Sequence, residues 1–172
     1  MEPDGVARCA ALAAALAVVS LACEPAGAPA LRDVDAIVVE KAARRLVLRS
    51  KGSVVRTYRV ALGAEPVGHK QREGDERTPE GTYLIDARNP DSAFHRSRRI
   101  SYPNDGDRRR ARAAGVDPGG LIMIHGIRNG LGWIGASHRL FDWTDGCIAV
   151  TNAEMDEIWA TVELGTPIEI RP

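Results

Sequence analysis

Cys147 is the residue of this sequence best suited to nucleophilic chemistry. It ends a Thr144-Asp145-Gly146-Cys147 turn, a few residues before a segment with the features of a helix start. A thiol attacks only as the thiolate, and a nearby histidine lowers its pKa. Gly146 allows a sharp turn close to a substrate, where backbone N–H groups can hold the oxyanion of acyl transfer. The turn therefore predicts a cysteine nucleophile whose base comes from elsewhere in the chain.

We expect His125 to be that base. It follows the continuous apolar run Leu121–Ile124, which is typical of a buried strand, and it precedes Gly126. A strand end holds an imidazole rigidly, and the carbonyl of Gly126 is free to orient the ring through its other nitrogen. His125 and Cys147 are therefore predicted to act together.

The other three histidines are weaker candidates. His69 and His95 stand in polar loops and are expected at the surface, whereas His138, in the loop before the cysteine, contacts either substrate or solvent. The chain has no HExxH, HxxEH or CxxC pattern, so neither a metal nor another cofactor is expected.

The composition says less than the motifs about which molecules the protein binds. The chain of 172 residues carries 23 Lys plus Arg and 23 Asp plus Glu, and it contains only three Trp, three Tyr and two Phe. Neither the balanced charge nor the few aromatic residues favours a nucleic-acid surface. The length fits one domain with an export signal.

The N-terminus resembles such a signal. An Ala-rich apolar run covers residues 6–22, too short for a confident membrane span. Cleavage after Ala30 would leave a mature domain of residues 31–172; alternatively, Cys23 is lipidated, and only then is the protein attached to a membrane. A buried Ala-rich helix is the remaining alternative. With a signal of residues 1–30, the protein is exported to the periplasm or cell envelope, and Cys147 is the single cysteine of the mature domain, as expected of a reactive thiol.

The elements that must position this pair are mainly strands. Alternating apolar residues predict a meander over residues 35–62, a strand at 82–85 and a last strand at 168–170. One firm helix is expected at Ala153–Val162, capped by Thr151 or Asn152. Residues 63–81 form a long loop, and the polar, Arg-rich stretch 89–117 is either a solvated excursion or a cap over an anionic ligand.

Two motifs resemble the YkuD, or L,D-transpeptidase, domain family. One is Ile124-His125-Gly126 followed by Thr144-Asp145-Gly146-Cys147-Ile148. The other is Gly68-His69-Lys70 followed by the segment Gly74-Asp75-Glu76-Arg77-Thr78-Pro79-Glu80-Gly81-Thr82-Tyr83. The resemblance covers residues 35–171 and implies a mainly β, mixed β-sandwich-like fold with one short helix after the nucleophile.

The resemblance also implies a reaction and its residues. Cys147 would attack the meso-diaminopimelate–D-alanine bond of a peptidoglycan stem tetrapeptide, His125 would be the base, and the Gly126 carbonyl would orient His125. The N–H groups of Gly146 and Cys147 would hold the oxyanion. Further substrate contacts are expected from the turn and from the loop before it: Thr144, Asp145, Arg128, Trp133 and His138. An amine acceptor would resolve the thioester and form a 3-3 cross-link or another amide.

Two alternatives remain open. Many family members carry Arg or Asn two residues after the cysteine, where this chain has Ala149. This difference favours a hydrolase on the same site, an L,D-carboxypeptidase or an amidase that cuts a stem–protein link. The other alternative is a non-catalytic wall-binding module, against which the intact Cys147, His125 and Gly126 argue.

Overall fold

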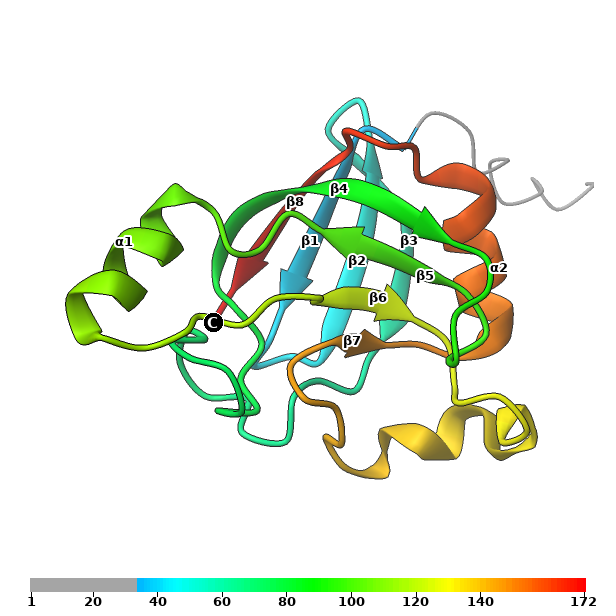
Figure 1. Ribbon diagram of the computed structural model, residues 1–172. Coiled ribbons are helices and arrows are strands. Elements are labelled where there is room, and N and C mark those ends of the chain that lie inside the picture. The colour runs from blue at the N-terminus through cyan, green and yellow to red at the C-terminus, as the bar shows by residue number, and fades with distance from the viewer. Residues whose placement is uncertain (1–33) are drawn as a thin grey trace, which may run out of the picture.

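Eight strands form one curled sheet in the computed structural model, which describes residues 34–172 (Figure 1). The strands are β1 (Ala36–Glu40), β2 (Arg45–Ser50), β3 (Ser53–Arg59), β4 (Gly81–Asn89), β5 (Ser97–Ile100), β6 (Met123–His125), β7 (Ile148–Ala149) and β8 (Pro167–Arg171). Their order across the sheet is β3-β2-β1-β8-β4-β5-β6-β7. The expected signal at residues 1–30, with its cleavage or lipidation site, lies outside the described residues.

Strand β4 divides the sheet into two halves that enclose the core. Its first residues pair with β8, and from Ile85 onward it pairs with β5, with an irregularity between Ile85 and Ala87. Such irregularities bend a strand and increase its twist. The apolar side chains of both halves meet inside, among them Leu46, Ile85 and Ile124, each 0% exposed. The mainly β, sandwich-like fold expected from the sequence is confirmed.

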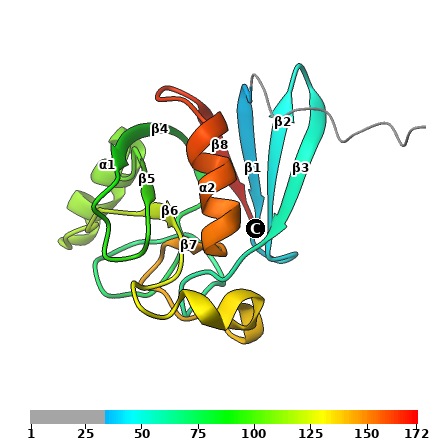
Figure 2. The same ribbon diagram turned by 90° about the vertical axis from the view of Figure 1, so that its right-hand side faces the viewer.

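Helix α2 (Asn152–Thr161) packs beside both halves of the sheet (Figure 2). Thr151 is its N-cap and forms a capping box with Glu154, as the sequence indicated. Met155 and Ile158 are its buried residues. Tyr58 of β3 donates a hydrogen bond to Glu157, at 2.7 Å, so the helix also has a polar link to one edge of the sheet.

A second helix, α1 (Asp105–Ala114), was not expected and lies apart from the sheet at the left of Figure 1. Its sequence is almost wholly polar, so it lacks the apolar stripe by which surface helices are recognised. A capping box of Asn104 and Asp107 begins it, and Gly115, with φ +67°, ends it. The helix predicted after the nucleophile is α2, and α1 is an additional helix that the sequence pattern did not indicate.

The stretch 89–117 is also less solvated than expected. Besides α1 it contains β5, where Ser97 and Arg98 are 0% exposed, and Arg98 donates to the carbonyl of Trp159 at 2.6 Å. Neither helix among residues 34–172 has the length and apolar character needed to cross a membrane.

Candidate active site

The pairing of β6 with β7 places His125 and Cys147 on one face of the sheet. The two strands run parallel, with Ile124 opposite Ile148 and His125 opposite Ala149. Ile124 and Ile148 point into the core. Because side chains alternate along a strand, His125 and Cys147, each one residue away, point to the other face.

That face opens into a cavity of about 680 Å³ whose walls include His125 and Cys147. Most of the lining is apolar or aromatic; the residues are Asn89, Ser92, Ala93, Phe94, Leu121, Met123, His125, Ile127, Arg128, Leu131, Ile134, His138, Phe141, Trp143, Thr144, Asp145 and Cys147. An apolar cleft of this size with a few convergent polar groups is the usual form of a small-molecule or peptide site.

His125 is held in the tautomer that a base needs. Its Nδ1 lies 2.6 Å from the carbonyl oxygen of Gly126, which can only accept, so Nδ1 carries the proton and Nε2 keeps its lone pair. This is the contact expected from the sequence. Burial lowers the pKa of His125, a shift that the Gly126 carbonyl partly offsets, so the ring is neutral at physiological pH.

Cys147 is partly exposed and protonated at rest. Its apolar surroundings raise the pKa of the thiol to about 11, and the charge of Asp145 adds to this, while a hydrogen bond from the Met123 backbone and the charge of Lys70 act in the opposite direction. The thiol lies 3.6 Å from the carbonyl oxygen of Leu121. The resting pair is thus a thiol and a neutral imidazole.

Thr144 fixes the turn that presents the cysteine. Its hydroxyl donates to the carbonyl of Cys147 at 2.7 Å and accepts from the N–H of Gly146 at 3.2 Å. The Gly146 N–H is expected to hold the oxyanion. In this structure it donates to the Thr144 hydroxyl, so it would have to leave that acceptor in order to bind the oxyanion. Thr144 lines the cavity, yet both hydrogen bonds of its hydroxyl are made within the turn.

The loop 63–81 packs directly against this turn. Gly146 has φ +119°, and a Cβ on it would lie 2.5 Å from the carbonyl oxygen of Arg77, so only glycine fits. Within the loop, Lys70 and Asp75 form a buried ion pair at 2.8 Å. Although burial acts to raise the pKa of Asp75, Lys70 and three backbone N–H groups lower it to about 2. The loop that carries the second sequence motif therefore supports the turn that presents Cys147.

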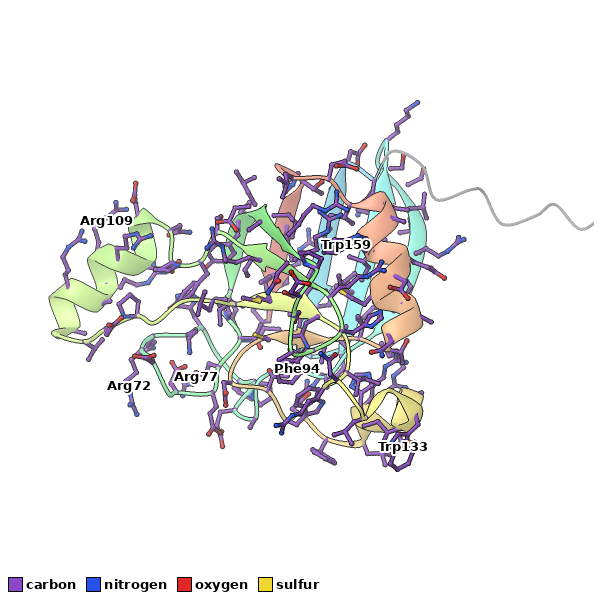
Figure 3. All side chains as sticks on the ribbon, turned by 45° about the vertical axis from the view of Figure 1, so that its right-hand side comes forward. Arg72, Arg77, Phe94, Arg109, Trp133 and Trp159 are labelled. Carbon is purple, nitrogen blue, oxygen red and sulfur yellow. The ribbon has the colours of Figure 1, made fainter. Side chains whose placement is uncertain are left out.

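The other residues expected to contact substrate differ in position. Asp145 and Arg128 line the cavity and are exposed, and His138 lines it while buried. Trp133 is 82% exposed, is absent from the lining and lies on the outer side of the 3-10 segment η1 (Gly132–Leu140) (Figure 3). Of the five residues expected to contact substrate, four line the cavity and Trp133 does not. The four are Arg128, His138, Thr144 and Asp145.

An aromatic wall beside the base was missed. Phe94 lies with its ring centroid 4.8 Å from that of His125, and Trp143 lies 5.7 Å from His125 and 6.0 Å from Phe94. Phe94 comes from the polar stretch 89–117, where no periodic pattern of apolar residues marks it. Phe94 is labelled near the centre of Figure 3. In the sequence it stands far from Cys147.

This fold and this pair of residues define the class of protein. The chain belongs to the YkuD family of L,D-transpeptidase catalytic domains, whose model matches residues 34–170. The reaction of this family member is taken up below.

Individual relatives agree with this family. The chain is 32% identical over 108 residues to YafK of Escherichia coli K12; the match covers 62% of this chain and 36% of YafK. The chain thus matches about a third of the length of its curated relatives.

Solved structures share the fold. The helical cell shape determining protein Pgp2 of Campylobacter jejuni superposes with a TM-score of 0.58 at 24% identity, over 81% of this chain and 48% of Pgp2. An L,D-transpeptidase of Xylanimonas cellulosilytica gives a TM-score of 0.52 at 17% identity, over 83% of this chain and 63% of the other.

Proposed function

We propose that the protein is a cysteine acyltransferase that opens the meso-diaminopimelate–D-alanine bond of peptidoglycan stem tetrapeptides and passes the acyl group to an amine. The observation that supports this most is the placement of Cys147 and the Nδ1-protonated His125 on one face of β6 and β7, at an apolar cavity. We further propose that it acts after export, in the periplasm or cell envelope.

In the first half-reaction, Nε2 of His125 takes the proton of the Cys147 thiol as the sulfur bonds to the stem carbonyl carbon. The carbon–nitrogen bond to D-alanine then breaks, and His125 returns the proton to the leaving amine. A neutral resting pair suits this sequence, because the proton moves only as the new bond forms. The product is a thioester on Cys147 and free D-alanine.

In the second half-reaction, an acceptor amine attacks the thioester carbonyl. His125 removes a proton from that amine, the carbon–sulfur bond breaks, and the thiolate regains the proton. The products are an amide cross-link and the free enzyme. The oxyanion of both steps requires backbone donors in the Thr144–Cys147 turn.

Hydrolysis of the same thioester is the second candidate. Ala149 is 0% exposed and is the strand partner of His125, and it has a methyl group where many family members carry Arg or Asn. A site with one contact fewer for an acceptor stem leaves water as a competing acceptor, which would make the protein an L,D-carboxypeptidase or a stem–protein amidase.

The test is to incubate the protein and its Cys147→Ala variant with disaccharide-tetrapeptide muropeptide and a D-amino acid, and to identify products by mass spectrometry. Dimers or D-amino-acid exchange that require Cys147 establish transpeptidation. Loss of D-alanine alone assigns a carboxypeptidase. The absence of any Cys147-dependent product would refute the proposed reaction and favour an amidase or a wall-binding module.

A further inference from the structure

A second histidine, His138, lines the same cavity as His125 and Cys147. It belongs to η1 and is only 3% exposed. Within residues 34–172 its Nε2 atom has no hydrogen-bond partner. Buried polar atoms are almost always paired, and a desolvated donor without an acceptor is costly, so this atom requires an explanation.

The neighbouring indole fixes which nitrogen of His138 carries the proton. Nε1 of Trp143, which can only donate, lies 3.5 Å from Nδ1 of His138. Nδ1 is therefore the acceptor, and the proton of the neutral ring is on Nε2. Burial, together with the positive charge of Arg139, lowers the pKa of His138 to about 4, so the ring stays neutral at physiological pH.

His138 and the dyad share one aromatic neighbour in the cavity wall. Trp143 meets both imidazoles edge-on, with ring centroids 5.7 Å from His125 and 6.3 Å from His138. A peptide whose scissile carbonyl lies at Cys147 spans about 3.3–3.6 Å per extended residue. A part of the acyl donor next to the scissile bond can therefore lie along the same wall as His138.

We propose that His138 is a specificity-determining residue whose Nε2–H donates to a carbonyl or carboxylate oxygen of the acyl donor. The inference rests on the proposed function, because it takes a stem peptide as that donor. A ligand oxygen would satisfy the buried N–H, and a ligand without one would leave it unpaired, which is how buried donors discriminate between substrates. Two oxygens of a stem peptide have this chemistry: a backbone carbonyl and the side-chain carboxylate of diaminopimelate.

The experiment compares wild-type protein with His138→Phe, which keeps a ring without a donor, and His138→Gln, which restores an N–H donor. Ser137→Ala, at an exposed neighbouring position, is the matched control. KM and kcat are measured with tetrapeptides that carry diaminopimelate or lysine at position three. Alkylation of Cys147 by iodoacetamide verifies that the nucleophile is unchanged in each variant.

We expect His138→Phe to raise KM about tenfold with kcat little changed, and His138→Gln to recover most of the loss. A rise for both peptides identifies the backbone carbonyl, and a rise confined to the diaminopimelate peptide identifies its carboxylate. An unchanged KM in His138→Phe, or a His138→Gln variant as impaired as His138→Phe, overturns the inference.

Failure of the proposed reaction is recognised separately, since the wild-type protein would then yield no product. In that case, calorimetry with the tetrapeptide compares Cys147→Ala with the Cys147→Ala/His138→Phe double variant. Weaker binding by the double variant supports the donor role, and equal behaviour of the two, including no binding by either, overturns it.

Discussion

At the scale of the residue, Cys147 and His125 are both uncharged in the resting site. Burial raises the pKa of Cys147 to about 11 and lowers that of His125, so both groups are neutral near pH 7. A preformed thiolate–imidazolium pair would instead require a thiol of low pKa. The site therefore differs from those of cysteine enzymes whose thiol is ionised before substrate binds.

The alkylation rate of Cys147 should report this difference. Because the thiolate fraction grows tenfold per pH unit below a pKa of about 11, the rate with iodoacetamide should rise about tenfold per unit from pH 7 to 10. Mass spectrometry of the full-length protein measures it, with Cys147→Ala as the background. A rate that is constant between pH 7 and 9 would show an ionised thiol and contradict the structure.

Much of the site at this scale was predictable from the sequence, because Cys147 and His125 each carry local signals. A glycine precedes the cysteine, and an apolar strand precedes the histidine. Phe94 carries no such signal, since its place beside His125 depends on the pairing of β5 with β6. The burial of His138 likewise depends on tertiary contacts of η1, which no periodicity of its sequence encodes.

At the scale of the element, a polar network holds α1 against the loop that backs the cysteine. Asp107, 3% exposed, accepts from Tyr83 at 3.1 Å and from the backbone of Asn104 at 2.9 Å, and it lies 3.0 Å from Nε2 of His69. His69 belongs to the loop 63–81 and accepts from the N–H of Glu80 through Nδ1. The buried carboxylate of Asp107 thus links α1 to β4 and to the loop 63–81.

Replacing that carboxylate should loosen both elements. Asp107→Ala leaves the Asn104 N–H without an acceptor and removes one of the two acceptors of the Tyr83 hydroxyl, which also lies 3.1 Å from the Glu80 carbonyl oxygen. We expect the substitution to lower the free energy of unfolding by about 2–4 kcal/mol. Hydrogen exchange should quicken in α1 and in residues 68–81. The control is Asp105→Ala, an exposed acidic residue of the same helical turn, for which we expect a change under about 1 kcal/mol. Equal effects of the two substitutions would contradict the network.

Elements with apolar periodicity were predicted, and elements without it were not. The meander, β4, β6, β8 and α2 each carry apolar residues in alternating, continuous or helical spacing, and they bury them, so local pattern and tertiary structure agree. Helix α1 depends on its caps and on Asp107, β5 buries an arginine, and β7 has only two residues. In those three cases long-range contacts decide the structure, and a single sequence does not reveal them.

At the scale of the whole molecule, the buried neutral histidines make stability sensitive to acid. The pKa of His138 is about 4 in the folded protein, below its ordinary value of 6.5, so protonation favours the unfolded chain. The contribution is fully present above pH 6.5 and is lost as the pH falls from 6.5 to about 4. Asp75, with a pKa of about 2, adds a separate loss only below its ordinary value of 3.8.

Denaturant unfolding at pH 7, 5.5 and 4.5 checks this window. We expect the wild-type protein to lose about 2–3 kcal/mol through His138 between pH 7 and 4.5, in addition to the loss through His125. His138→Gln, which cannot take a proton, should retain that part of its stability. Curves of the same slope for both proteins would show that His138 does not titrate as the structure requires.

Strand β8 has a consequence for biosynthesis. It comes last in the described chain, at Pro167–Arg171, yet it lies between β1 and β4 and pairs with both of them (Figure 1). Until these residues are available, β1 and β4 each have an unpaired edge, and strands β1 to β3 have no backbone connection to β4 through the sheet. The sheet is therefore complete only once residues 167–171 have been added, and a chain truncated before residue 167 would expose strand edges prone to aggregation and proteolysis.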